Sequence, residues 1–206
     1  MKLLNNRNGQ DKEQKLAVFR AKCAEMITRQ YGDADKWMIR FNPERQTEVA
    51  QSIEKVFRDN ITPSLVRFSY AYGEDKVQTW LSIQLSTIIM TEGEKTNTGP
   101  DVVFKAAADI LCEPEFKVLR PTDIMLFCVQ FRTGRYGKVY GSLNAINICA
   151  ALREFCQWRQ SQLDRVEKER ERAERELYDK TAITWRQYCE IKGLDPEDNP
   201  LKKISE

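Results

Sequence analysis

An uninterrupted helical pattern over residues 143–177 constrains this chain most. Positions at alternating steps of three and four form a seam with the heptad spacing of coiled coils. At about 1.5 Å per residue, one helix over this range is roughly 50 Å long. The pattern predicts a single long helix, whose seam holds Cys149, Leu152, Cys156, Arg159, Leu163, Val166, Arg170, Ala173 and Leu177.

The second half of this predicted helix is densely charged, because eleven of the thirteen positions in 164–176 are acidic or basic. The simplest interpretation is a solvated face stabilised by i, i+4 ion pairs. The alternative is pairing of the heptad seam with another helix or a second copy of the chain. Arg159 and Arg170 on the seam would weaken a self-paired coil.

The rest of the chain also carries helical patterns and helix start signals. A first amphipathic helix is predicted to end near Tyr31-Gly32, with an apolar face that we expect to be core; it holds Leu16, Phe19, Cys23, Met26 and Ile27. A later helix over Ile124 to Phe131 is expected to end at Gly134, placed where a left-handed residue closes a helix. Thr184 and Gln187 form a capping box for a last short helix.

Together these patterns predict an all-α fold: a helical globular body with a long charged C-terminal helix and a short final helix. We expect a flexible N-terminus at 1–10 and a helical body at 11–158 that includes a glycine loop at 134–141. A charged helical extension at 159–180, a short capped helix at 181–194 and a disordered tail at 195–206 complete the expected organisation.

Composition excludes several classes of protein. With 41% hydrophobic and 31% charged residues, the chain resembles globular helical proteins. It has no apolar run of the roughly 20 residues that a spanning helix needs, and its start lacks the apolar stretch of a secretory signal. We therefore expect a cytoplasmic protein without a membrane contact.

Catalytic and metal-binding chemistry find little support. The chain has no histidine, which removes imidazole as a general base or metal ligand. No C-x-x-C pair occurs among its six cysteines, so we expect reduced thiols and no zinc. The glycine loop is not a P-loop, because no Gly-Lys-Ser/Thr follows at the required spacing. The sequence predicts a protein that is not an enzyme and holds no cofactor or metal.

The glycine loop has a composition that packing alone does not require. It combines three glycines with cations and tyrosines, and residues 120–159 hold six basic residues against two acidic ones. Nucleic acids favour this combination of close backbone approach, positive charge and stacking faces. If the loop binds DNA, phosphate contacts are expected from three cations and base stacking from one of two tyrosines: Arg132, Arg135, Lys138, Tyr136 and Tyr140.

The quartet at residues 134–137 is similar to the backbone clamp of KH domains, which also favours a binding loop. A second interpretation of the same loop is structural. The simpler interpretation is a tight turn between two helices whose tyrosines pack on the core. The sequence leaves both interpretations open.

Residues 127–159 also carry a pattern, F-x-x-G-x-Y-G-x-x-Y-G-x-L-N followed by A-L-R-E-F and an arginine. In this stretch the chain resembles an uncharacterised family of small proteins from phages and integrated mobile elements of gut bacteria, somewhat like phage replicative helicase loaders. The resemblance implies a non-enzymatic adaptor in DNA transactions of a mobile element or phage, such as a replication accessory. The expected partners are DNA and, through the long helix, a replicative helicase or another protein.

The alternative function is a protein-interaction or phage structural module that binds no nucleic acid. The sequence does not set the oligomeric state, and the resemblance supplies no catalytic residues.

Overall fold

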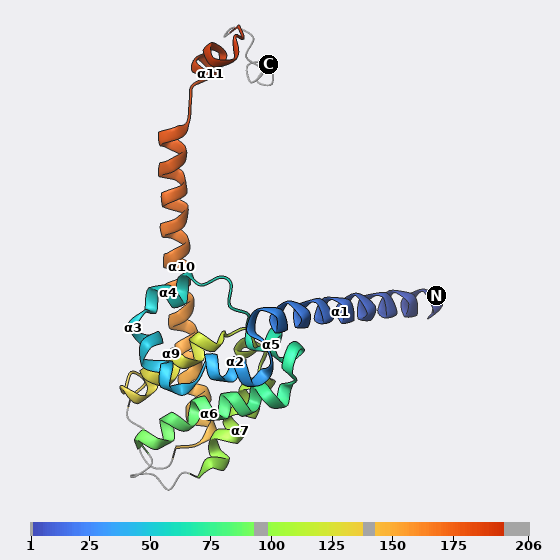
Figure 1. The fold of residues 1–206 in the computed structure, drawn as a ribbon, viewed down its shortest axis with the longest axis vertical. Helices are drawn as coiled ribbons and strands as arrows, with labels where there is room; N and C mark the ends of the chain where they lie inside the picture. Colours follow the sequence, from blue (N-terminus) through green and yellow to red (C-terminus); the bar gives the residue numbers. More distant parts are fainter. Residues whose placement is uncertain (1, 93–98, 138–142, 196–206) are drawn as a thin grey trace. The chain divides into compact units, whose positions relative to one another are not determined.

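A computed structural model describes residues 2–92, 99–137 and 143–195 (Figure 1). These residues form helices with no strand among them, so the predicted all-α fold is confirmed. The elements are α1 (Lys2–Tyr31), α2 (Ala34–Arg40), a 3₁₀ turn η1 (Pro43–Arg45), α3 (Gln46–Gln51), α4 (Ile53–Arg58), α5 (Leu65–Tyr72), α6 (Glu74–Glu92), α7 (Pro100–Cys112), α8 (Pro114–Lys117), α9 (Pro121–Arg132), α10 (Ala145–Thr181) and α11 (Trp185–Lys192).

The chain divides into two compact units, unit 1 at Met1–Leu163 and unit 2 at Asp164–Glu206. The predicted long helix is confirmed as α10, which contains the boundary between the units. The sequence placed the end of the body at residue 158. Unit 1 extends further because Arg159 lies 3.0 Å from the buried carboxylate of Asp123 in α9.

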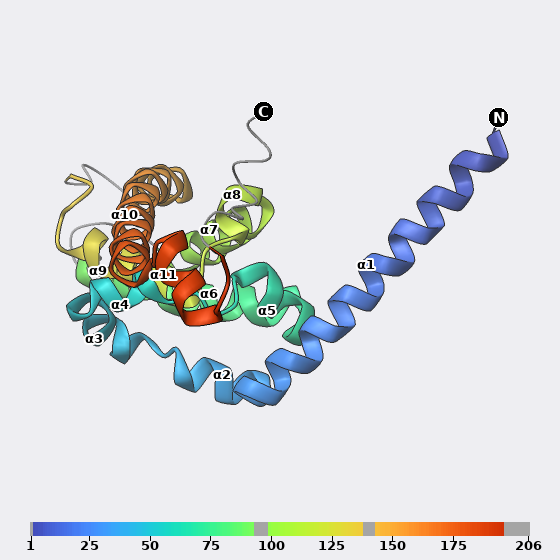
Figure 2. The same cartoon turned by 90° about the horizontal axis from the view of Figure 1, so that it is seen from above.

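An aromatic cluster joins α1, α2, α5 and α6 in unit 1. Trp37 is fully buried and stacks on Phe68 with ring centroids 4.9 Å apart, while Tyr31 meets Phe68 edge-on at 5.2 Å. The Tyr72 hydroxyl donates to the Gly32 carbonyl oxygen at 2.9 Å. The last turns of α1 are therefore fixed beside α5 (Figure 2).

The rest of α1 differs from the prediction in the exposure of its apolar face. The helix begins at Lys2, and the flexibility expected at residues 1–10 stays a prediction. Its apolar residues were expected to be core, yet Leu16, Phe19 and Met26 are 44%, 48% and 70% exposed. The side of α1 that holds Ile27 and Arg20 meets α5, so Ile27 is buried, while Leu16, Phe19 and Met26 lie on other sides of the helix.

A buried polar network joins α3, α6 and α9. The Gln46 side-chain amide donates to Gln84 Oε1 at 2.8 Å, and the Gln84 amide donates to the Phe41 carbonyl at 2.7 Å. Both glutamine side chains are fully buried. Because each donates to a buried acceptor, the network fixes the register of these helices.

A buried carboxylate clamps the start of α9 to α10. Asp123 accepts from the Arg120 backbone N–H at 2.8 Å and from Arg120 Nε at 3.2 Å, and it is paired with Arg159 of α10. Two cations around one buried carboxylate make this joint sensitive to the loss of the acid.

Unit 2 contains the end of α10 and the whole of α11. The charged part of α10 is exposed and carries i, i+4 ion pairs in which the base precedes the acid, including Arg172 with Glu176 at 3.1 Å. The capping box of α11 is confirmed, since the Thr184 backbone N–H donates to Gln187 Oε1 at 2.8 Å. The tail expected at 195–206 lies, apart from its first residue, outside the described residues.

Candidate nucleic-acid interface

The turn after α9 closes as the sequence predicted. Gly134 has a φ of 78°, in the left-handed region that favours glycine. The Arg135 backbone N–H donates to the Gln130 carbonyl at 3.0 Å, and the Gly134 N–H donates to the Phe131 carbonyl at 3.0 Å. These two bonds satisfy the last carbonyls of α9 and form a Schellman closure.

Tyr136 of the glycine loop packs inward. Its hydroxyl donates to Gln130 Oε1 at 2.6 Å, and its ring lies 5.6 Å from the ring of Phe127 and 6.2 Å from that of Phe131. Burial raises the pKa of Tyr136 well above its usual value, so the phenol stays a hydrogen-bond donor. This is the arrangement that the turn interpretation predicts, and it uses the ring for packing.

Arg132 is half-buried at the end of α9 and reaches into the glutamine network. Its Nη1 donates to Gln46 Oε1 and, at 2.6 Å, to Thr87 Oγ1. Both acceptors are neutral. The guanidinium is therefore held in place without loss of its charge.

Arg135 lies on the outer side of the loop and is exposed. Its guanidinium carbon is 4.2 Å from the ring centroid of Trp158 in α10, within the range of a cation–π contact. Trp158 itself packs edge-on against Phe57 of α4 at 5.3 Å. The contact orients Arg135 and leaves its charge uncancelled.

The other basic residues that the structure describes in this stretch are paired with acids. Arg120 and Arg159 share Asp123, and Arg153 lies 3.0 Å from Glu115. Positive charge is therefore concentrated at the end of α9 and the loop, where Arg132 and Arg135 have neutral partners. Of the predicted site residues, Lys138 and Tyr140 lie outside the described residues.

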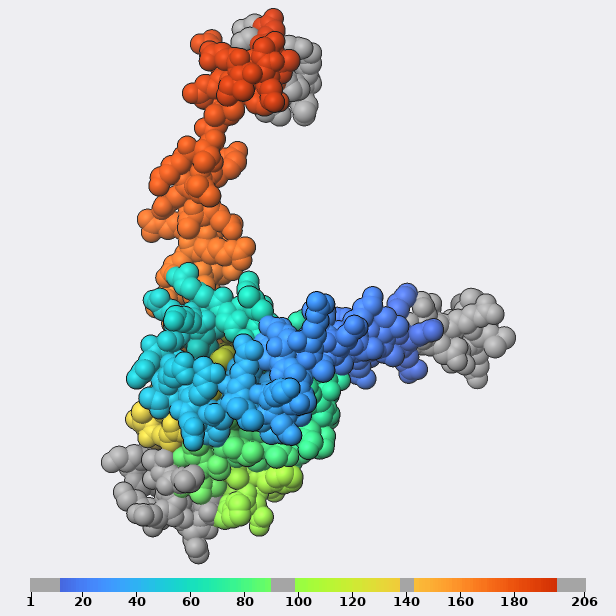
Figure 3. Space-filling view, viewed as in Figure 1, coloured from blue at the N-terminus to red at the C-terminus, as the bar shows by residue number. Residues whose placement is uncertain are grey.

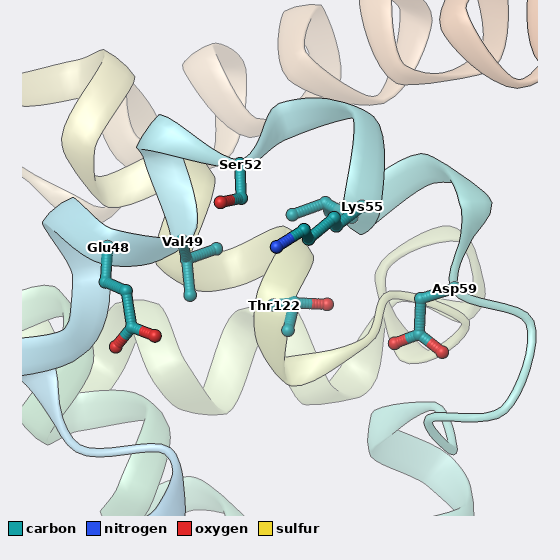
Figure 4. A pocket seen from close by; sticks show the side chains of 7 residues that line it. Glu48, Val49, Ser52, Lys55, Asp59 and Thr122 are labelled. Atoms are coloured by element: carbon teal, nitrogen blue, oxygen red, sulfur yellow. The ribbon is translucent and has the colours of Figure 1, made fainter.

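A separate cavity of about 330 Å³ lies between α3, α4 and the first turn of α9 (Figure 4). Burial alone would raise the pKa of Asp59, but hydrogen bonds from Thr62 and Ile61 and the charge of Arg120 outweigh it and lower that pKa. Asp59 is thus engaged by its own loop. The lining is Glu48, Val49, Ser52, Lys55, Val56, Asp59 and Thr122.

The cysteines offer little nucleophilic chemistry. All six are free thiols. Burial raises the pKa of Cys128 to about 12 and that of Cys156 to about 11, so both stay protonated near neutral pH.

Across the described ranges, no group of three or more carboxylate and thiol side chains could hold a metal ion. Within the same ranges no helix has the length and apolar character to cross a bilayer.

Helix α1 carries exposed cations that are not among the predicted site residues. Lys15, Lys22 and Arg29 are all exposed and follow one another at steps of seven residues. Their signal in the sequence is the seven-residue spacing of like charges, on a helix that was predicted from its apolar residues.

Comparison with known proteins gives one match. A model of a family of unknown function (DUF6633) matches residues 102–199, a range that runs from α7 past α11 and includes the glycine loop. Neither the curated proteins nor the solved structures include a match.

Proposed function

We propose that the protein is a non-enzymatic adaptor in DNA transactions of a mobile element, and that it contacts nucleic acid at the glycine loop. The observation that carries the proposal is the pair Arg132 and Arg135. Each is held in a defined orientation by neutral partners beside the loop that also contains Lys138. Fixed, uncancelled cations favour a phosphate backbone because little ordering entropy is lost on binding.

The packing of Tyr136 alters the form of the proposed contact. Since this ring lies against Phe127 and Phe131, we assign base stacking to Tyr140 and phosphate contacts to the cations. Arg132 uses Nη1 for both of its hydrogen bonds, which leaves its other guanidinium N–H groups for a phosphate. The helicase-loader-like role rests on the resemblance of residues 127–159 and is part of the same proposal.

Titration of the full chain with labelled single- and double-stranded DNA over a series of salt concentrations tests this function. Arg135→Ala combined with Lys138→Ala should weaken binding by about 10-fold or more at low salt and reduce the salt slope by about 2. Arg132 is left intact in this variant because its loss would also disturb Gln46. A matched control, Arg67→Ala with Lys105→Ala, removes the same charge from α5 and α7.

Affinity that the loop variant retains in full would exclude the loop as the contact. Wild-type protein that binds neither form of DNA at low salt would overturn the nucleic-acid function itself.

A second candidate is a protein-interaction module without nucleic-acid binding, and α11 favours it. This helix is capped at both ends, with Gly193 at a φ of 67° at its C-terminus, yet it buries little of its apolar face. Exposed apolar side chains surround it in unit 2: Leu177 at 62%, Tyr178 at 71%, Ile183 at 51%, Ile191 at 69% and Leu194 at 50%. Amphipathic helices of this kind dock into apolar grooves of other proteins.

Sedimentation of the full chain distinguishes the second candidate. If α11 mediates self-association, Leu177→Ser with Ile191→Ser lowers the measured mass, whereas the control Lys180→Ser with Glu190→Ser does not. Equal masses for wild type and both variants would count against self-association through α11.

A further inference from the structure

Helix α1 carries a line of cations on the side that faces away from its neighbour α5. Lys15, Lys22 and Arg29 are exposed and recur every seven residues. In an α-helix, a step of seven residues returns to within about 20° of the same direction. The three side chains therefore form one stripe, about 21 Å long at 1.5 Å per residue. We call these three residues the α1 stripe.

The packing of α1 orients the stripe. Ile27 and Tyr31 are buried against the rest of unit 1, and they point roughly 140–180° away from Lys22 and Arg29 at 100° per residue. Arg20, on the buried side, lies over the ring of Tyr70 in α5 at 5.2 Å. The α1 stripe consequently faces outward from unit 1, and in the space-filling view α1 stands out from its surface (Figure 3).

Charge is concentrated on this helix. Residues 12–31 hold five basic side chains against Glu13 and Glu25, a net charge of +3, although the whole chain is only +2. Two acids are at helical spacing from the stripe: Asp11 is four residues before Lys15, and Glu25 is four residues before Arg29. Because residues 120–159 sum to +4, the excess positive charge of the chain lies in two regions, α1 and the glycine-loop region, and each can attract a polyanion.

We propose that the α1 stripe is a second nucleic-acid contact, which binds the phosphate backbone of duplex DNA. Cations fixed along a straight helix suit a straight duplex, which presents about one phosphate charge per 1.7 Å of its axis. None of the three stripe residues is aromatic, and the one exposed ring beside them on the described part of α1 is Phe19, so the stripe offers few of the stacking faces that single strands favour. An anionic membrane surface is the competing ligand, since Leu16, Phe19 and Met26 of α1 are exposed. It fits less well because Ile27 and Tyr31, the rest of the apolar face, are buried and cannot enter a bilayer.

This inference rests on the proposed function for its class of ligand, but it concerns different residues. The full chain with Lys15→Gln, Lys22→Gln and Arg29→Gln is compared with wild type in binding to a short mixed-sequence duplex over a salt series. We expect affinity to fall about 10-fold or more at low salt and the salt slope to fall by about 2 to 3. Glutamine retains helix propensity, so the thermal transition should not change.

Two further variants act as controls. Arg67→Gln, Lys76→Gln and Lys105→Gln remove the same charge from exposed positions of α5, α6 and α7. Lys15→Arg, Lys22→Arg and Arg29→Lys preserve the charge of the stripe. We expect both variants to bind the duplex within about 2-fold of wild type, since neither removes a phosphate contact of the stripe.

Several outcomes would overturn the inference. If the stripe variant matches the charge control while Arg135→Ala with Lys138→Ala abolishes binding, the loop function stands and the α1 contact is excluded. Wild-type protein that fails to bind any DNA removes the proposed function and the stripe together. Loss of co-sedimentation with vesicles containing phosphatidylserine, with unchanged DNA affinity, would assign the stripe to a membrane surface.

Discussion

The glycine-loop region, made of α9, residues 133–137 and α10, and the exposed part of helix α1 present opposite cases. The loop looks like a binding surface in the sequence, yet Tyr136 packs inward and Arg132 is bonded to buried Gln46 and Thr87. Helix α1 looks like core, yet Leu16 and Phe19 are about half exposed. Cations and aromatic rings therefore indicate binding only when their neighbours are known.

The two regions therefore differ in whether the same side chains contribute to both folding stability and binding. In the glycine-loop region the same side chains, such as Arg132 and Arg135, both contact their neighbours and carry positive charge. Substitutions there should therefore change folding stability as well as affinity. On α1 the packing residues and the stripe lie on different faces, so charge can be removed with little effect on folding. Four predictions examine this contrast.

The largest effect is expected at the joint between α9 and α10. Asp123→Ala leaves Arg120 and Arg159 without their buried carboxylate. Breaking such a pair costs about 3–5 kcal/mol of unfolding free energy, because the buried Arg120 and the largely buried Arg159 are left uncompensated. Chemical denaturation measures the loss. A cost below 1 kcal/mol would mean that the joint is open to water.

Tyr136 should have the next largest effect. Tyr136→Ala removes ring packing against Phe127 and Phe131 and should lower the unfolding free energy by about 2–3 kcal/mol, less than for a fully buried ring. Tyr136→Phe removes only the bond to Gln130 and should cost about 1 kcal/mol. Equal stability of wild type and Tyr136→Ala would favour a loop that binds rather than packs.

A buried thiol next to the loop should make stability depend on pH. Burial raises the pKa of Cys128 to about 12, whereas a thiol in the unfolded chain ionises near 8.5. The folded state holds this proton more tightly, so its contribution is complete below about pH 8.5 and is lost as pH rises towards 12.

By about pH 10 the loss should reach roughly 1–2 kcal/mol. The contribution of Cys128 is measured by comparing the unfolding free energies of wild type and Cys128→Ala at neutral and at alkaline pH. Parallel curves for the two proteins would show that Cys128 is accessible to water.

The smallest effect is expected on α1. Leu16→Ser with Phe19→Ser should change the unfolding free energy by less than about 0.5 kcal/mol per residue, because both side chains are exposed. Ile27→Ala on the same helix, where only 4% of the residue is exposed, should cost about 2–4 kcal/mol. A large loss from the first variant would show that the exposed face of α1 is covered in solution.

Much of the fold followed from local patterns. The heptad seam predicted α10, the capping box predicted the start of α11, and Gly134 predicted the end of α9. These features depend on neighbours within one or two turns, which a sequence displays directly. The extent of the body did not follow, because Arg159 belongs to unit 1 through Asp123, 36 positions earlier in the chain.

For the candidate sites, too, some properties follow from local sequence and others from contacts between distant segments. The sequence by itself determined which residues carry charge and aromatic surface, and where helices begin and end, because capping and periodicity are local properties. Only the tertiary structure decided that Glu115 and Asp123 neutralise half of the cations in 120–159, leaving Arg132 and Arg135 with neutral partners. It also decided which face of α1 meets α5. Pairing and burial depend on contacts between segments far apart in the chain, and local spacing contains no record of them.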